Sequence, residues 1–102
     1  MKFDHVALQS ENIANSVKWY VENYDAKVLY EDDTWAMMEI AGARIALVSP
    51  NQHPPHFCFE VDDKFISEKL SSKVFKKHRD GSESCYIRDP DGNFIEFLKW
   101  PD

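Results

Sequence analysis

Residues 5–8, with the sequence HVAL, return as HFCF at residues 56–59, so the pattern recurs after half of a 102-residue chain. Each copy places a histidine at the head of a short apolar run, which is typical of a buried β-strand. We expect these strands to span about 2–8 and 55–61. Similar apolar runs predict six more strands, at about 26–31, 35–41, 43–48, 74–78, 83–88 and 93–99. The repeat therefore predicts two similar halves.

Two segments between these strands have apolar residues at helical spacing. The first lies within residues 10–24, where Ser10 or Asn12 can cap the helix. Its apolar positions are Ile13, Val17, Tyr20, Val21 and Tyr24. The second lies within residues 61–70, with Asp62 as the cap candidate. Its apolar positions are Phe65, Ile66 and Leu70.

The element order reads βαβββ followed by βαβββ, which predicts an α+β fold. We expect a curled eight-stranded mixed sheet around a cleft, in one domain over residues 1–102. It would consist of a module at 1–50 and a module at 51–102, joined by the Pro- and Asn-containing stretch around 49–55. The segment at 89–93, DPDGN, predicts a tight turn between the last two strands.

Composition excludes several classes of function. The net charge is −6 and Lys and Arg are scattered, which disfavours a nucleic-acid partner. No apolar stretch approaches the ~20 residues of a membrane span, and the N-terminus lacks the apolar core of a signal peptide. Cys58 and Cys85 do not form a disulfide framework. These features predict a cytoplasmic, reduced protein with no nucleic-acid or membrane partner.

Three residues carry the strongest chemical signal, namely His5, His56 and Glu96, each on an apolar strand. Strand alternation puts Phe3, His5 and Ala7 on one face, then His56, Cys58 and Glu60, then Phe94, Glu96 and Leu98. The opposite faces, with Val6, Leu8, Phe57, Phe59, Val61, Ile95 and Phe97, suit packing under the helices. Two imidazoles and one carboxylate form a facial metal-ligand set with open positions for substrate. Singly, each residue also has an ordinary structural explanation, as a core histidine or a half-exposed glutamate.

The chain resembles the vicinal oxygen chelate superfamily, which includes glyoxalase I, extradiol dioxygenases, fosfomycin-modifying enzymes and bleomycin-resistance proteins. The resemblance rests on four stretches: FDHVAL at 3–8, NSVKWY at 15–20, HFCFEVD at 56–62 and DPDGNFIEF at 89–97. It implies paired βαβββ modules around a metal cleft. It also implies that His5, His56 and Glu96, which match the family's ligand positions, bind the metal.

One metal ligand that the resemblance implies for some members of the family is missing from this chain. Four-ligand members such as glyoxalase I carry a further ligand on the fourth strand, and the internal repeat locates that slot at Ala46. Because alanine cannot coordinate, the resemblance favours the three-ligand pattern of the dioxygenases and fosfomycin-modifying enzymes. A mixed imidazole and carboxylate site favours Fe(II) or Mn(II), with Zn, Ni or Co still open.

Other candidate site residues rest on weaker signals. Arg44 lies on the same strand face as Ala46 and is a candidate to bind a substrate anion. An exposed arginine on an edge strand, with no role in a site, is an equally good explanation. Phe94, on the face of Glu96, is a second substrate-binding candidate. His53 and Tyr86 are candidates for proton transfer. A loop histidine such as His53 is more often simply solvated.

Two functions from different classes follow. The first is a divalent-metal-dependent enzyme acting on a small oxygen-bearing substrate, with dioxygenase, lyase or transferase-like chemistry. The second is a metal-free binding protein of the bleomycin-resistance kind, and a regulatory dimer with a vestigial site is a third alternative. A homodimer is expected under all of them, because a chain this small exposes much sheet surface.

Overall fold

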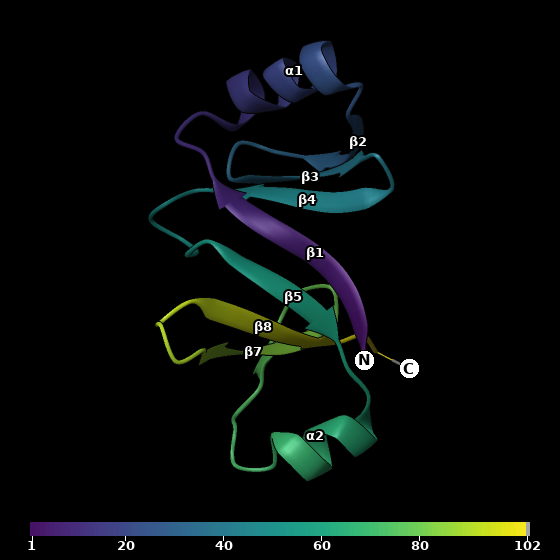
Figure 1. The fold of residues 1–102 in the computed structure, drawn as a ribbon, viewed down its shortest axis with the longest axis vertical. Coiled ribbons are helices and arrows are strands. Elements are labelled where there is room, and N and C mark those ends of the chain that lie inside the picture. The colour runs from purple at the N-terminus through teal and green to yellow at the C-terminus, as the bar shows by residue number, and fades with distance from the viewer. Residues whose placement is uncertain (102) are drawn as a thin grey trace. The chain divides into compact units, whose positions relative to one another are not determined.

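The structure is a computed structural model, and it describes residues 1–101. Two compact units make up the chain: one runs from His5 to His56, and the other combines Met1–Asp4 with the chain from Phe57 onward. Figure 1 shows the fold and labels all of its helices and strands except β6. Their bounds are β1 (Lys2–Gln9), α1 (Ile13–Tyr24), β2 (Lys27–Glu31), β3 (Trp35–Ile40), β4 (Ala43–Val48), β5 (His56–Glu60), α2 (Asp63–Lys69), β6 (Lys76–Lys77), β7 (Glu83–Arg88) and β8 (Phe94–Lys99).

The predicted α+β class is confirmed, with the βαβββ order twice and parallel as well as antiparallel strand pairs. The strand expected at 74–78 is shorter than predicted, because only Lys76 and Lys77 pair, with Ser84 and Glu83. Val74 is 91% exposed and has no core to pack against, so apolar character alone does not extend the strand.

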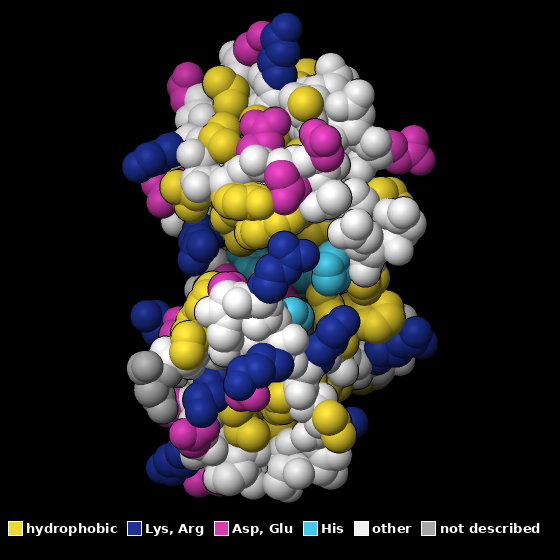
Figure 2. All heavy atoms as spheres, turned by 180° about the vertical axis from the view of Figure 1, so that it is seen from behind, with side chains coloured by type: hydrophobic (Ala, Val, Ile, Leu, Met, Phe, Trp, Pro, Cys, Tyr) yellow, Lys and Arg dark blue, Asp and Glu magenta, His cyan; other side chains and the backbone are white. Residues whose placement is uncertain are grey.

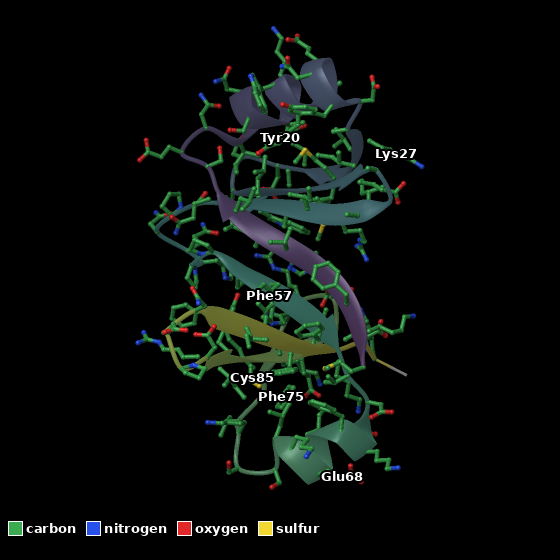
Figure 3. All side chains as sticks on the ribbon, viewed as in Figure 1. Tyr20, Lys27, Phe57, Glu68, Phe75 and Cys85 are labelled. Carbon is green, nitrogen blue, oxygen red and sulfur yellow. The ribbon has the colours of Figure 1, made fainter. Side chains whose placement is uncertain are left out.

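In the His5–His56 unit, the strands are ordered β2-β3-β4-β1, with β1 parallel to β4 and the other pairs antiparallel. Helix α1 covers one face of this sheet (Figure 1). The core between them contains Ile13, Val17, Ala26, Ala36, Met38 and Leu47, with Tyr20, Ile40 and Ile45 packed against it. Figure 3 shows Tyr20 between α1 and the sheet. Alternate residues of β3 and β4 thus face the helix, as their period of two requires.

Helix α1 begins where the sequence predicts a cap. The Asn12 side chain accepts a hydrogen bond from the Asn15 backbone N–H at 3.0 Å, so Asn12 rather than Ser10 is the cap. The apolar stripe is narrower than predicted, because Val21 is 39% and Tyr24 57% exposed. Val21 is rotated about 100° from Tyr20 and so leaves the buried face. Tyr24 lies in the last turn, where its ring contacts Trp19 at 5.4 Å instead of the core.

The turn between β3 and β4 sets the register of the His5–His56 unit. Ala41 and Gly42 both have positive φ, of 51° and 80°, as a two-residue type I′ hairpin turn requires. This turn pairs Glu39 with Arg44 and Met37 with Ala46. Because paired residues share a face, Arg44 and Ala46 lie on the face away from α1.

In the other unit, the strands are ordered β5-β8-β7-β6, and α2 packs on one face. The Asp62 side chain caps α2 by accepting from the Phe65 N–H at 2.9 Å, as predicted. Phe97 lies 5.6 Å from the Phe65 ring and 6.2 Å from the Phe59 ring, which places these aromatic residues under the helix. Phe57 contacts the Phe59 ring at 5.9 Å but is 38% exposed, so it is less covered than expected.

The β7–β8 turn has the predicted chemistry. Asp89 accepts hydrogen bonds from the backbone N–H groups of Asp91 and Asn93, at 2.9 and 2.8 Å. Gly92 has a φ of +87°, a conformation that glycine adopts at little cost. The turn therefore holds β7 and β8 in one register.

Strand β1 departs from simple alternation near its start. The Phe3 ring lies 5.9 Å from Phe59, on the α2 side of β5, and is 55% exposed. Asp4 is buried, and a carboxylate oxygen of Asp4 lies within 4.8 Å of Cys58 Sγ. Asp4 and His5 are both buried although they are adjacent, so the expected common face of Phe3 and His5 is wrong. Leu8, expected under a helix, is 40% exposed.

Among residues 1–101, no helix is long and apolar enough to cross a membrane.

Candidate functional site

The His5–His56 unit brings two histidines together. His5 lies on β1 and His56 begins β5, and each is less than a tenth exposed. Their ring centroids are 5.6 Å apart with the planes at 73°, and one ring nitrogen of each lies within 4.8 Å of the other. Two adjacent buried imidazoles can share one metal ion when both are neutral. The internal repeat predicts equivalent strand positions for these two side chains, and the fold brings them together.

A backbone carbonyl sets the tautomer of His56. Its Nδ1 lies 2.8 Å from the carbonyl oxygen of Pro54, and because a carbonyl only accepts, Nδ1 carries the proton. The lone pair of the neutral ring is then on Nε2. Metal-binding histidines characteristically have this arrangement, in which a second hydrogen bond orients the ligand nitrogen.

His53 also lies near His56. Their ring centroids are 6.4 Å apart, and His53 is half-buried. The His53 carbonyl accepts a hydrogen bond from Gln9 Nε2 at 3.0 Å, which ties residues 49–55 to the end of β1. The expected linker is therefore held against β1 and presents a second imidazole beside His56.

Ala46 lies on the face that carries His5. It pairs in register with Ala7, two residues beyond His5, and both belong to a buried apolar cluster with Met37 and Val48. The methyl group of Ala46 offers no donor atom, so the position at which the resemblance implies a fourth ligand cannot coordinate a metal. Arg44 is half-buried on the same face, directly opposite Glu39.

Glu96 lies in the other unit, on β8, and is 9% exposed. It pairs in register with Tyr86, so both side chains lie on one face of the β7–β8 pair. Phe94, on the same face, contacts the Tyr86 ring at 6.0 Å and lies under the Arg88 guanidinium at 4.7 Å. This face therefore combines a carboxylate, a phenol, an aromatic ring and a cation.

Burial raises the pKa of Tyr86 above its usual range, and the nearby negative charge of Glu96 raises it further. Ionised phenolate is costly in this environment, so the group keeps its proton well beyond neutral pH. Tyr86 can therefore donate a hydrogen bond or a proton to a bound molecule, but it is a poor general base.

In metal-free protein, we expect Tyr86 to remain protonated at pH values where an ordinary tyrosine side chain ionises. Ultraviolet absorbance of phenolate during a pH titration measures this. Tyr86→Phe should leave the folded-state titration near pH 10 unchanged, because Tyr86 does not contribute there. Tyr86→Phe should also reduce the loss of folding stability above pH 10. Because the pKa of Tyr86 is higher in the folded than in the unfolded protein, the free energy of unfolding of the wild type falls as pH rises above 10. Loss of one titrating group near pH 10 in Tyr86→Phe would contradict the raised pKa.

The sequence anticipated most of these positions but missed one. His5 and His56 come together in one unit; Glu96, Tyr86 and Phe94 come together in the other. Arg88 was missed, although it lies two residues beyond Tyr86 on the same strand. Strand alternation from Tyr86 was the signal that could have found it.

Comparisons with known proteins agree with this fold. The sequence profile of the Glyoxalase/Bleomycin resistance protein/Dioxygenase superfamily matches residues 2–97. The chain is 30% identical over 115 aligned positions to biphenyl-2,3-diol 1,2-dioxygenase 2 from Rhodococcus globerulus, covering 93% of this chain and 60% of that protein. The chain thus spans under two thirds of the length of this relative.

Solved structures share the fold at lower sequence identity. Methylmalonyl-CoA epimerase from Mycobacterium tuberculosis has a TM-score of 0.77 at 16% identity, over 99% of this chain and 89% of that one. A glyoxalase/bleomycin resistance protein/dioxygenase superfamily member from Vibrio splendidus 12B01 has a TM-score of 0.70 at 17% identity, over 93% and 96%. With the profile match across nearly all of its length, this chain belongs to the Glyoxalase/Bleomycin resistance protein/Dioxygenase superfamily.

Proposed function

We propose that this chain is a metal-dependent enzyme whose divalent ion is held by His5, His56 and Glu96. The observation that carries the proposal is the buried His5–His56 pair, in which the Pro54 carbonyl leaves the His56 lone pair on Nε2. Glu96 supplies the carboxylate in this proposal because the resemblance implies a ligand at its position and because its side chain is buried on β8. Mixed nitrogen and oxygen donors suit Fe(II) or Mn(II) best, with Zn, Ni or Co as other occupants.

The remaining polar groups have distinct roles in the proposed enzyme. A divalent ion, when bound, would polarise the oxygen atoms of a small substrate as a Lewis acid. Tyr86 would donate a hydrogen bond to a substrate oxygen, because its raised pKa keeps it protonated. His53 would accept or return a proton, since it is a half-buried imidazole beside His56.

Substrate recognition is assigned to Arg44 and Phe94. The Phe94 ring meets the Tyr86 ring edge to face and lies under the Arg88 guanidinium, so it would offer an apolar wall for a flat substrate. Arg44 would pair with a substrate anion. The similarity to a biphenyl-diol dioxygenase makes aromatic diols the first substrate class to test, and lyase and transferase-like reactions remain within the proposal.

A metal-free binding protein is the second candidate function. The observation that favours it is the apolar cluster of Ala7, Met37, Ala46 and Val48, on the face of His5. All four side chains are apolar and buried, so this cluster supplies no further ligand for a metal. Such a protein would bind aromatic compounds equally well with and without a metal.

Metal loading tests the proposal. Protein purified without chelators, then dialysed against Mn²⁺ or anaerobic Fe²⁺, should retain about one ion per chain and unfold at a higher temperature. Elemental analysis and thermal denaturation measure the two effects. Retention of less than a tenth of an ion per chain, with no shift for any of Mn, Fe, Ni, Co or Zn, would refute the enzyme and favour the binding protein.

A further inference from the structure

We propose that β2 is a dimer contact at which two copies of this chain pair their β2 strands antiparallel about a two-fold axis. Strand β2 is the edge strand of its unit, since its hydrogen-bonded neighbour is β3 on one side alone in the described chain. An edge strand presents backbone N–H and C=O groups that can pair with a second chain.

The exposure of β2 is unusual for an apolar strand. All of its residues are exposed, and its central three, Val28, Leu29 and Tyr30, are 41%, 43% and 44% exposed. Tyr30 also stacks on Trp35, which is itself 36% exposed, with ring centroids 4.4 Å apart. Figure 2 shows hydrophobic side chains at the surface of the part of the molecule that contains β2. Contiguous exposed apolar surface of this kind is typical of an interaction site.

The charges at the two ends of β2 identify a second copy as the occupant. The strand reads KVLYE, with Lys27 at its start and Glu31 at its end. In an antiparallel pairing centred on Leu29, each Lys27 lies opposite the partner's Glu31, and Val28 lies opposite the partner's Tyr30. Shifting the register by one residue separates Lys27 from Glu31 at both ends. In one direction Lys27 then lies opposite Asp32, whose carboxylate already accepts hydrogen bonds from the backbone N–H groups of Thr34 and Trp35. Opposite-charge and aromatic–aliphatic pairs both stabilise adjacent antiparallel strands.

The local geometry leaves Lys27 and Leu29 available for this contact. Figure 3 shows Lys27 extending outward from its strand. Leu29 lies at a β-bulge, because the pairing to β3 passes from Val28↔Met38 directly to Tyr30↔Met37. The bulge leaves Leu29 without a cross-strand partner in its own sheet, and the two-fold axis gives it one. A closed two-fold contact also protects the edge from open-ended association.

Charge reversal tests the pairing without touching the core. Glu31→Lys places lysine opposite lysine at both ends of the contact and should weaken dimerisation by about tenfold or more. Lys27→Glu should do the same. The double variant Lys27→Glu/Glu31→Lys, and an equimolar mixture of the two single variants, should restore dimers. Sedimentation velocity over a concentration series measures each dissociation constant.

The matched control is Glu68→Lys, which makes the same charge change at an exposed position of α2, in the other unit. It should leave the dissociation constant unchanged. As a second measurement, Leu29→Cys should form an intermolecular disulfide on mild oxidation, because the axis brings the two copies of this position together. Val74→Cys, at a fully exposed site, should not. A monomer at every concentration, or a dimer that neither charge reversal nor Leu29→Cys affects, would overturn the proposal.

Discussion

Replacing His56 by alanine is expected to weaken Mn²⁺ binding by more than about 100-fold. Loss of a residue that merely orients a metal ligand typically costs 10- to 100-fold in affinity, and removal of the ligand itself costs more. In the proposed site His56 is one of two buried imidazoles with ring nitrogens within 4.8 Å. Titration of metal-free protein with Mn²⁺, followed by calorimetry or electron paramagnetic resonance, measures the affinity.

His5→Ala and Glu96→Ala should show losses of the same order if all three residues bind one ion. His78→Ala is the matched control, because its ring bonds Ser84 at 2.6 Å in the other unit and has no part in the proposed site. Its affinity for Mn²⁺ should equal that of the wild type. A His56→Ala variant that folds, as circular dichroism would show, and binds Mn²⁺ as tightly as wild type would rule out this ligand set.

Met38→Ala is expected to lower the free energy of unfolding by about 3 kcal/mol. Met38 is fully buried on β3 in the core beneath α1, so truncation removes apolar contacts and leaves a cavity. Large-to-alanine substitutions of this kind typically cost 2–5 kcal/mol. Urea denaturation, with the linear dependence of free energy on denaturant, measures the change.

Val74→Ala provides the contrast, because Val74 is 91% exposed and its truncation should change stability by less than about 0.5 kcal/mol. Met38→Leu, which nearly conserves volume, should lose less than about 1.5 kcal/mol. A Met38→Ala loss no larger than that of Val74→Ala would mean that this core does not hold the His5–His56 unit together.

Helices, strands and turns with clear hydrophobic periodicity and clear capping or turn residues at their ends were predictable from the sequence. The helix caps Asn12 and Asp62, the Asp89–Asn93 turn and most strand bounds follow from local chemistry, which acts within a few residues. Predictions that needed a distant partner were less reliable. Val74 has an apolar side chain but nothing to pack on, and Tyr24 extends past the core that its helix covers.

The predictions for the candidate site divide in the same way, between local patterns and contacts with distant residues. The alternation of side chains along β4 predicts that Arg44 and Ala46 share one face. In the structure, the β1–β4 register puts Ala46 beside Ala7 on the face of His5. Parity along β1 failed near Asp4, where two adjacent residues are buried. Strand alternation from Tyr86 could have placed Arg88 on the same face, but its contact with Phe94 depends on the pairing of β7 with β8.

The sequence by itself determined the α+β class, the repeated βαβββ order and the three candidate ligands on apolar strands, because periodicity and the HVAL/HFCF repeat are local properties. Tertiary structure alone decided that His5 and His56 meet, that the Pro54 carbonyl sets the His56 tautomer, and that burial beside Glu96 keeps Tyr86 protonated. It also decided that β2 is an exposed edge. Each of these depends on which residues become neighbours, and strand pairing between distant segments sets that.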